Sequence, residues 1–408
     1  MRILQLCKKF PYPVKDGESI AISYLARALS DLGCEVTLLA MNTSKHRVDT
    51  GGVSLETFAH YAAVHAVPVD NHIRPLAALR NLMSDRSYHI ERFEHEAFAE
   101  RLRQLLREEQ FDVVQLETLY LAPYVPIIRE NSRAIVVLRA HNVEHEIWER
   151  IAANSNPVKK WYLNRITPRL KKYEIEQLSA YDLLSGITER DVTHFRRLGL
   201  RKAAVVTPIG LDSRDYQPDP SSFQRPLSLS FIGSLDWMPN LEGLRWFLDE
   251  VWQPLLAPRF PELTFHIAGR NTPDWLRRLA LDRVVVHGEV ERAADFINQH
   301  SLMVVPLLSG GGMRAKILEG MALGKVALST RIGMEGIAAR HKKEALLADT
   351  PAEFAEAIAW CYEQGGALAQ IGDKARRLCA EDYDNLAGAR RLLEAFHAAR
   401  AEGVGAAR

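Results

Sequence analysis

The chain has 408 residues, more than one hydrophobic core usually accommodates, so two domains of about 200 residues each are expected. Its hydrophobic content of 47% and charged content of 25% are typical of a globular protein, and a net charge of +1 excludes a global field that attracts nucleic acid. The cysteines show no metal-binding spacing, which predicts buried thiols in a reducing compartment (Cys7, Cys34, Cys361 and Cys379). No segment is long and apolar enough for a transmembrane helix, so a cytoplasmic protein is expected.

The amino-terminal segment has the order strand, loop, helix, strand. Residues 2–7 form an apolar run typical of a buried strand, and a loop containing prolines and charged residues follows. Ser19 is predicted to cap a helix that ends near Leu32, and residues 35–40 form the next predicted strand. This order is typical of the first half of a Rossmann-like domain. Residues 71–110, which are rich in arginine, are expected to be helical.

Polar side chains follow a later strand of the same predicted domain. Residues 111–116 and 134–138 are expected to be parallel strands, and the second of them leads into His141, Asn142 and Glu144. Open α/β sheets bind ligands at the carboxyl ends of their strands. His141 is therefore a candidate catalytic residue, with Asn142 and Glu144 beside it on the acceptor side. The alternative, a structural histidine followed by residues that cap the next helix, stays open.

A basic helix is predicted over residues 159–173. Its basic side chains alternate with aromatic and aliphatic ones (Lys159, Lys160, Arg165, Arg169, Lys171 and Lys172). A helix of this composition is attracted to an anionic membrane surface. In the alternative, the apolar face packs on its own domain and the basic residues are simply solvated.

The second half of the chain repeats the alternation of strands and helices. Residues 183–187 and 203–207 are predicted to complete the first sheet, and residues 213–226 read as a linker because they contain three prolines and few apolar residues. Strands of a second sheet are expected at residues 227–233, 263–268, 283–287, 302–307, 326–329 and 345–348. The pattern predicts an α/β protein with two doubly wound domains.

The stretch from Leu302 to Gly324 carries the strongest chemical signal, because it combines a strand, three consecutive glycines and a helical pattern. The backbone N–H groups at such a helix N-terminus suit an anion, above all a phosphate. Arg314 and Lys316 lie in the first predicted turn, where cations oppose the helix dipole, so a bound diphosphate would explain them. The alternative is a glycine-rich turn with solvated basic residues and an ordinary surface pair of Lys316 and Glu319.

This block, together with the second glycine turn Gly333-Met-Glu-Gly336, resembles the donor-binding signature of glycosyltransferase family 4. The resemblance implies a retaining, nucleotide-sugar-dependent enzyme of the GT-B fold, with two Rossmann-like doubly wound domains facing across a cleft. It implies an acceptor-binding domain at residues 1–212, a linker at 213–226 and a donor-binding domain at 227–382. The C-terminal helix, about residues 383–400, is expected to cross back onto the first domain.

The resemblance also implies roles for individual residues. Arg314 and Lys316 would neutralise the departing diphosphate, and Glu319 would hold the nucleotide ribose. The resemblance implies that the donor is bound by Gly17, Gly233, Arg270, Val290, Gly311, Gly312, Met313 and Glu319. Enzymes of this fold generally need no metal, and no cofactor is expected beyond the nucleotide-sugar substrate. The Asp-Tyr-Asp sequence at residues 382–384 is discounted as a metal motif because it lies in the C-terminal helical region.

The sequence departs from the commonest family pattern in two places. Eight residues before Glu319, where many members have a glutamate that touches the sugar, this chain has Gly311. Many members also have an arginine and a lysine after the first strand of the second domain, whereas the segment from Gly233 to Asn240 contains no basic residue. The diphosphate charge therefore falls on the cations of the glycine loop, with Arg270 as a weaker helper.

The sequence thus predicts a hexosyl- or deoxyhexosyltransferase that moves a sugar from a nucleotide diphosphate to a hydroxyl acceptor in cell-envelope or exopolysaccharide assembly. A nucleotide-sugar epimerase on the same scaffold and a non-catalytic nucleotide-sugar binder stay open as alternatives. The expected partners are the donor, a glycan or lipid-linked acceptor and, in one alternative, the anionic inner face of a membrane; nucleic acid is not expected. The sugar, the nucleotide, the linkage and the oligomeric state are left open.

Overall fold

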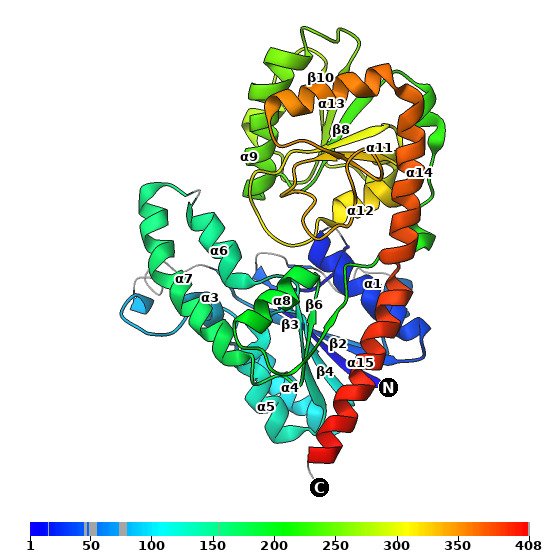
Figure 1. Cartoon of the computed structure of the whole chain (residues 1–408). Helices are drawn as coiled ribbons and strands as arrows, with labels where there is room; N and C mark the ends of the chain where they lie inside the picture. Colours follow the sequence, from blue (N-terminus) through cyan, green and yellow to red (C-terminus); the bar gives the residue numbers. More distant parts are fainter. Residues whose placement is uncertain (15, 45–46, 49–54, 73–79, 154, 407–408) are drawn as a thin grey trace. The chain divides into compact units, whose positions relative to one another are not determined.

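The computed structural model describes the chain except at residues 15, 45–46, 49–54, 73–79, 154 and 407–408. The chain divides into two compact units (Figure 1). Unit 1 contains Met1–Gly210 and Asn385–Arg408, and unit 2 contains Leu211–Asp384. Each unit is built around one parallel sheet with helices on its faces, which agrees with the predicted pair of Rossmann-like domains.

The sheet of unit 1 has the strand order β3-β2-β1-β4-β5-β6-β7, and every pairing in it is parallel. Its strands are β1 (Arg2–Cys7), β2 (Glu35–Thr43), β3 (Ala63–Val69), β4 (Val113–Leu116), β5 (Ile135–Ala140), β6 (Leu183–Gly186) and β7 (Ala203–Val206). The order reverses between β1 and β4, where Ile3 pairs with Val36 on one side and with Val113 on the other. Open sheets of this kind bind ligands at the carboxyl ends of the strands beside such a reversal.

Helices cover both faces of this sheet: α1 (Gly17–Asp31), α3 (Tyr88–Glu91), α4 (Glu96–Glu108), α5 (Val125–Asn131), α6 (Glu144–Ala153), α7 (Pro157–Gln177), α8 (Glu189–Arg197) and α15 (Asn385–Ala406), with 3-10 turns at Leu55–Phe58 and Leu119–Tyr124. Successive strand residues serve opposite faces, so Ile3 packs with α1 and α15 while Leu4 packs with α4 and α5. The last helix, α15, lies against α1 (Figure 1).

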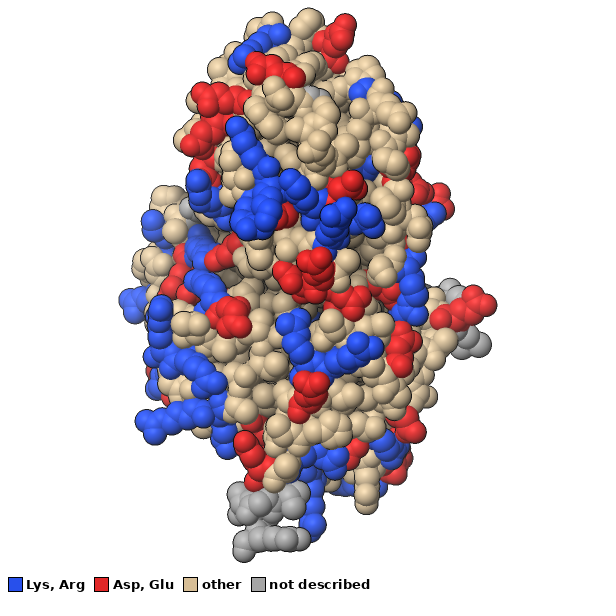
Figure 2. Space-filling model, turned by 45° about the vertical axis from the view of Figure 1, so that its right-hand side comes forward, with Lys and Arg blue, Asp and Glu red and all other residues tan. Residues whose placement is uncertain are grey.

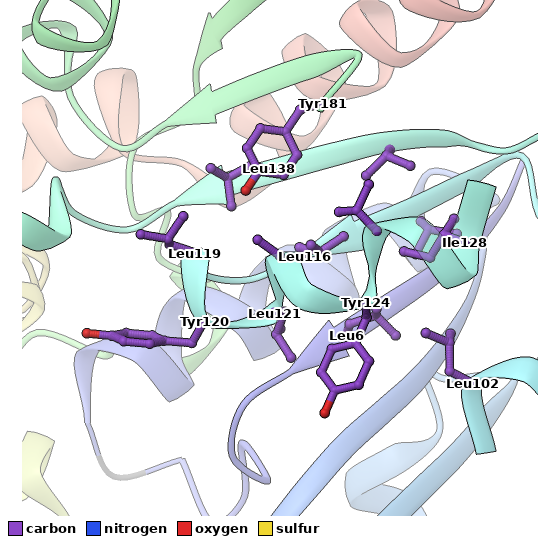
Figure 3. Packing of buried hydrophobic residues seen from close by; sticks show 14 of the residues in the cluster. Leu6, Leu102, Leu116, Leu119, Tyr120, Leu121, Tyr124, Ile128, Leu138 and Tyr181 are labelled. Carbon is purple, nitrogen blue, oxygen red and sulfur yellow. The ribbon is translucent and has the colours of Figure 1, made fainter. Parts of the chain in front are cut away.

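Figure 3 shows one hydrophobic core of unit 1. Leu6, Leu116 and Leu138 come from the neighbouring strands β1, β4 and β5, and they point into the same cluster as Leu102 of α4 and Ile128 of α5. All five side chains are at most 2% exposed. Burial of this extent is what holds the carboxyl ends of the three central strands, and the polar residues that follow them, in fixed positions.

Three predictions for unit 1 were wrong in detail. Asp16, rather than Ser19, is the N-cap of α1, because the Asp16 carboxylate accepts a hydrogen bond from the Ser19 backbone N–H at 3.0 Å. Strand β3 was not predicted; it is an edge strand, the position in a sheet that tolerates its Pro68. In the described part of residues 71–110 only α3 and α4 are α-helical beyond a residue or two, and the rest of that prediction, at 73–79, lies outside the described residues.

The sheet of unit 2 has the order β10-β9-β8-β11-β12-β13 and is also parallel. Its strands are β8 (Ser228–Ile232), β9 (Thr264–Ala268), β10 (Val284–Gly288), β11 (Leu302–Val305), β12 (Val326–Ser329) and β13 (Leu346–Leu347). Its helices are α9 (Met238–Trp246), which continues as a π-helix over Phe247–Leu256, α10 (Asp274–Arg277), α11 (Ala293–Asn298), α12 (Ala315–Ala322), α13 (Pro351–Glu363) and α14 (Gly365–Asp382). The turn between β12 and β13 replaces the helix expected there.

The segment at residues 213–226, predicted to be a linker, is grouped with unit 2. The buried Lys325 explains this, because its ammonium donates hydrogen bonds to the Asp219 carbonyl and to the Ser222 hydroxyl at 2.9 Å. Lys325 also donates to the Asn298 carbonyl at 3.2 Å. A buried ammonium needs several acceptors, and here the backbone of the proline-rich segment supplies one of them.

Lys and Arg side chains are interspersed with Asp and Glu over the face that Figure 2 shows, as a net charge of +1 would suggest. Among the described helices, none combines the length and the apolar composition that crossing a membrane requires.

Candidate functional site

The glycine loop of unit 2, defined here as residues 309–314, joins β11 to α12. Gly310 and Gly312 have φ angles of 100° and 75°, a backbone region that side-chain-bearing residues rarely adopt. A Cβ on Gly310 would also lie 3.2 Å from the Trp237 ring. The loop is also bound to α9, because the Ser309 hydroxyl donates to the Glu242 carboxylate of that helix at 2.6 Å. These contacts hold the backbone of the glycine loop next to the N-terminus of α12, where an anion site requires free backbone N–H groups.

Arg314 is the N-cap residue of α12 rather than part of its first turn, which corrects the predicted helix start. Its side chain is 6% exposed, and its guanidinium donates hydrogen bonds to the carbonyls of Gly311 and Gly312. The guanidinium carbon lies 5.6 Å from the centre of the Trp237 ring. Arg314 therefore shapes the glycine loop as well as adding positive charge to it. Met313, beside it, is buried.

Lys316 lies in the first turn of α12, as predicted. Its ammonium donates a hydrogen bond to the Asn240 side-chain oxygen at 2.8 Å, and the Asn240 amide donates in turn to the Ser234 carbonyl. The ammonium lies 4.4 Å from the centre of the Phe231 ring, and a Cβ on Gly233 would be only 3.2 Å from it. Lys316 thus places its charge directly after β8, where the predicted family pattern has basic residues that this chain lacks.

The electrostatic surroundings of Lys316 are unusual. Burial, followed by the nearby charge of Arg314, lowers the pKa of Lys316 to about 7. Among the residues that the structure describes, no carboxylate forms a salt bridge with Lys316. A desolvated ammonium without a counter-charge gains strongly from a bound anion.

Glu319 does not pair with Lys316, which removes the alternative of an ordinary surface pair. The Tyr216 hydroxyl donates to the Glu319 carboxylate at 3.0 Å instead. Burial raises the pKa of Glu319 to about 7, although the Tyr216 hydrogen bond opposes this shift. Glu319 is half-buried and lies on the same helix as Lys316, with the Tyr216 hydroxyl as its hydrogen-bond donor.

The other predicted donor residues of unit 2 follow the carboxyl ends of their strands. Gly233 follows β8, and its backbone N–H donates to the Ala268 carbonyl at 3.2 Å. Arg270 follows β9, and its carbonyl accepts from the Leu235 backbone at 2.8 Å. Val290 follows β10, after Gly288 with a φ of 74°. The sheet thus brings the glycine loop and these three positions to one edge, as parallel topology requires.

Gly17, the remaining predicted donor residue, is the first residue of α1 in unit 1. The N-cap residue Asp16 beside it is clamped by Lys9, whose ammonium lies 2.8 Å from both carboxylate oxygens. Burial would raise the pKa of Asp16, but the charge and hydrogen bond of Lys9 outweigh it and lower that pKa to about 2.

The second polar group is the histidine cluster of unit 1, defined here as Gln5, Gln115, Glu117, Arg139 and His141. His141 follows β5 and lies 2.8 Å through its Nε2 from the Glu117 carboxylate, which follows β4. Glu117 also accepts from Gln5, Gln115 and Arg139. Glu117 is fully buried and His141 is 8% exposed. A buried ion pair thus stands directly behind the predicted catalytic histidine.

Glu144, predicted on the acceptor side, is the first residue of α6. Its carboxylate accepts a hydrogen bond from the Tyr120 hydroxyl at 2.8 Å. Burial raises the pKa of Glu144 to about 7, while the charge of Lys8 opposes the shift. Lys8 lies 4.7 Å from the centre of the Tyr120 ring and 3.5 Å from the Glu18 carboxylate. Lys8, Glu18 and Tyr120 therefore join Glu144 in a charged group that sequence reasoning missed.

The start of α6 is capped, but not by the residues that the sequence suggested. The Glu174 carboxylate of α7 accepts hydrogen bonds from the backbone N–H groups of Glu144 and His145, and so caps the start of α6 from outside. Its Oε2 also lies 2.6 Å from the Nδ1 atom of His145. Asn142 is half-buried, and it is not needed as the cap.

Some of these residues could have been found from the sequence. Glu117 directly follows a predicted strand, which is the same signal that identified His141. Asn240 lies in the segment where the family pattern has basic residues. Tyr216 and Tyr120 carry no such signal, because only the folded chain brings them to Glu319 and Glu144.

Comparisons with known proteins agree with this architecture. Residues 16–210 match the family described as "Glycosyl transferase 4-like domain", and residues 226–364 match the family described as "Glycosyl transferases group 1". A curated relative, an "Uncharacterized 44.6 kDa protein in cps region" of Klebsiella pneumoniae, is 23% identical over 94% of this chain and 97% of its own length.

Two solved structures show the same fold. Sucrose-phosphate synthase from Thermosynechococcus elongatus has a TM-score of 0.74 at 15% identity, covering 98% of this chain and 100% of its own. Anabaena HepE in complex with UDP, and again with UDP-glucose, has a TM-score of 0.68 at 16% identity over 98% of this chain and 100% of its own. The two parallel sheets, each with polar residues at the carboxyl ends of its strands, are thus the two Rossmann-like domains of the GT-B glycosyltransferase fold.

The family matches make the assignment more specific than the fold alone. The chain belongs to the group 1, family 4-like glycosyltransferases.

Proposed function

We propose that this glycosyltransferase transfers a hexosyl or deoxyhexosyl group from a nucleotide-diphosphate sugar to a hydroxyl acceptor, with retention of anomeric configuration. One observation carries the donor part of the proposal. Lys316 is desolvated, sits at the N-terminus of α12 beside a loop of left-handed glycines, and has no carboxylate partner among the described residues. A diphosphate would supply the missing negative charge.

The remaining donor contacts follow from the same geometry. Arg314 holds the loop carbonyls so that the backbone N–H groups of the loop and of α12 remain available to phosphate oxygens. In this proposal Glu319, which accepts a hydrogen bond from the Tyr216 hydroxyl, also accepts hydrogen bonds from ribose hydroxyls. The complexes of Anabaena HepE with UDP and with UDP-glucose support a nucleotide-sugar donor for a chain of this fold.

The chemical route we propose is attack by the acceptor hydroxyl on the same face as the leaving diphosphate. The leaving phosphate oxygen takes the acceptor proton, and Lys316 with Arg314 stabilises the negative charge that develops on the diphosphate. This route needs neither a metal ion nor the pair of carboxylates that a double displacement uses. His141 then orients a substrate hydroxyl rather than forming a covalent intermediate.

The cps region in the name of the Klebsiella pneumoniae relative supports a role in polysaccharide assembly. The acceptor we propose is a glycan or a lipid-linked glycan. The α6–α7 hairpin fits the lipid-linked form, because Val158 and Trp161 at the start of α7 are 80% and 56% exposed beside the exposed Lys159, Lys160 and Arg165. Exposed apolar residues among basic ones favour peripheral contact with an anionic membrane.

The apolar face of α7 itself behaves as the alternative prediction stated. Leu163, Ile166 and Leu170 are at most 3% exposed, so this face packs within unit 1. Membrane contact is therefore proposed for the start of the helix and not for its whole length.

The experiment that tests the function is a screen of nucleotide sugars by thermal shift, followed by product analysis with the donor that stabilises the protein. A sugar transferred to an added glycan or lipid-linked hydroxyl supports the proposal. Interconversion of the sugar without acceptor would identify an epimerase, and binding without transfer or hydrolysis would identify a binding protein. The anomeric configuration of the product decides retention.

A further inference from the structure

The Glu117 carboxylate is the centre of the histidine cluster. Its Oε1 accepts hydrogen bonds from the side-chain amides of Gln5 and Gln115, each at 2.6 Å. Its Oε2 accepts from the Arg139 guanidinium at 3.2 Å and lies 2.8 Å from His141 Nε2. Burial alone would raise the pKa of Glu117, but Arg139 and the hydrogen bond with His141 outweigh it and lower that pKa to about 2. With its pKa lowered in this way, Glu117 is an ionised carboxylate at neutral pH.

An ionised carboxylate can only accept hydrogen bonds. The contact at 2.8 Å therefore requires that His141 Nε2 carry a hydrogen. Burial lowers the pKa of His141, and the charge of Arg139 lowers it further, while Glu117 and Glu18 of α1 act in the opposite direction. Lys8, Lys9 and Asp16 surround Glu18 and complete the set of charges on this side. A neutral imidazole has one N–H, so the His141 Nδ1 atom keeps its lone pair.

The direction of this arrangement matters. The Arg139 Nη1 atom that donates to Glu117 also donates to the Ala21 carbonyl at 3.0 Å, so the ion pair is linked to α1. The described residues contribute no hydrogen-bond partner to His141 Nδ1. The free acceptor of the imidazole thus points away from the buried carboxylate.

We infer that Glu117 is a positioning residue that holds His141 in the Nε2–H tautomer and so presents Nδ1 as the acceptor for a substrate hydroxyl. The substrate half of this inference rests on the proposed glycosyl transfer, whereas the tautomer half does not. The same logic orients the histidine of a Ser-His-Asp triad, although here the two ring nitrogens exchange places.

A second buried pair in unit 1 is the natural control. His145 lies 2.6 Å through Nδ1 from the Glu174 carboxylate, and both residues are at most 2% exposed. Glu174 also accepts hydrogen bonds from two backbone N–H groups of α6, so helix capping explains its burial beside His145. Changing Glu174 to Gln alters a similar buried histidine pair without touching His141.

The first test uses the wild-type protein, so it does not depend on a variant that folds. Nitrogen-15 NMR of the histidine ring nitrogens, with the His141 signals identified by their loss in His141→Gln, distinguishes the two neutral tautomers. We expect the Nε2–H form at neutral pH. An Nδ1–H form, or a charged ring at neutral pH, would overturn the inference.

The second test compares Glu117→Gln with Glu174→Gln. In Glu117→Gln a neutral amide with one acceptor oxygen replaces a carboxylate that serves Gln5 and Gln115 on one oxygen and Arg139 and His141 on the other, so the hydrogen of His141 is no longer fixed on Nε2. We expect kcat to fall about tenfold or more at every pH, since a hydrogen bond to the substrate is lost. UDP affinity, measured by calorimetry, should change less than about twofold for a step that acts after donor binding.

Two results would contradict the inference. One is a Glu117→Gln variant in which kcat keeps its maximum value and only the fall of kcat at acidic pH moves to lower pH. That result would show a change in the pKa of His141 without a change in its tautomer. The other is an equal loss in Glu174→Gln, which would make the effect one of general packing. A wild-type protein that turns over no nucleotide sugar would count against the proposed function alone, since the NMR measurement still decides the role of Glu117.

Discussion

The histidine cluster of unit 1 and the glycine loop of unit 2 occupy equivalent places, at the carboxyl ends of central parallel strands, but their electrostatics are opposite. In unit 1 the buried cation is matched, because Arg139 is paired with Glu117. Nearby, Lys9 is paired with Asp16. In unit 2 the neutral oxygen of Asn240 and the Phe231 ring lie beside Lys316, and no carboxylate among the described residues pairs with it.

This difference shows what each site can recognise. A matched ion pair has little to gain from an added charge, so the cluster of unit 1 is suited to orienting neutral hydroxyl groups. An unmatched, desolvated ammonium gains most from an anion, so the glycine loop is suited to a diphosphate. The contrast supports the donor and acceptor roles that we propose for the two domains, and five experiments can contradict it or define it more closely.

Removing the unmatched charge has the largest expected effect. Lys316→Ala should lower transfer by about 10²–10³-fold, because a charge-assisted contact to the leaving diphosphate is lost while the fold is kept. Arg314→Ala should behave alike, since it loses both its charge and the hydrogen bonds that shape the loop. The matched control is Lys374→Ala, an exposed lysine of α14. Turnover near the wild-type value in both loop variants, measured with the identified donor, would remove the diphosphate assignment.

The second effect is on the pH dependence of donor binding. The pKa of Lys316 is lowered to about 7, and only the protonated form attracts the diphosphate, so the apparent Kd for UDP should rise above pH 7 by about tenfold per pH unit until the pKa of the complex is reached. Calorimetric titrations between pH 7 and 9 measure this slope. In Lys316→Arg the guanidinium stays protonated, so the slope should disappear. A Kd for wild type that does not change over this range contradicts the unmatched ammonium.

The third experiment asks whether the exposed start of α7 adds a membrane to the acceptor side. Reversing Lys159 and Lys160 to Glu should lower binding to vesicles of anionic lipid by about tenfold or more, at roughly 1 kcal/mol for each basic residue near the surface. The control reverses Lys171 and Lys172, which already lie 3.8 Å from Glu149 and Glu176 respectively and attract lipid less. Co-sedimentation that is equal for all three proteins, or insensitive to salt, points to an acceptor free in solution.

A smaller effect is expected on stability. The folded pKa of Glu144 is raised to about 7 from the usual 4.5, so its contribution to stability is present below pH 4.5 and is lost as the pH rises through 7. Glu144→Gln avoids this loss and keeps an acceptor for Tyr120. Its Tm relative to wild type should therefore be higher at pH 8 than at pH 5.5, by about 2–4 °C for each kcal/mol. If scanning calorimetry finds the same difference in Tm between variant and wild type at both pH values, the pKa of Glu144 is not raised.

The smallest effect is the one expected from a chelator. Because the glycine loop, Arg314 and Lys316 neutralise the diphosphate in the proposed route, excess EDTA should change the transfer rate by less than about twofold. Activity abolished by EDTA and restored by Mg²⁺ or Mn²⁺ would show that the protein charges alone are not sufficient.

Much of the fold was predictable because parallel sheets leave a strong local signal. Strands β1 and β12 are nearly continuous apolar runs, and their bounds are the predicted ones. The edge strand β3 was missed because it carries Pro68 and is less buried, so its pattern resembles a loop. The linker was misassigned because composition shows that residues 213–226 are polar but not that Lys325 holds them to unit 2.

For the site, the sequence by itself determined the glycine loop, the cations of its helix and the polar residues after β5, because each lies within one strand–loop–helix unit where spacing implies position. Only the tertiary structure decided the partners. Asn240 reaches Lys316, Tyr216 reaches Glu319, and Glu117 reaches His141 across 24 to 103 positions of the chain. Local patterns specify which groups stand at the end of a strand, but the neighbours that set their charge and orientation come from other strands, and the order of those strands is a property of the folded sheet.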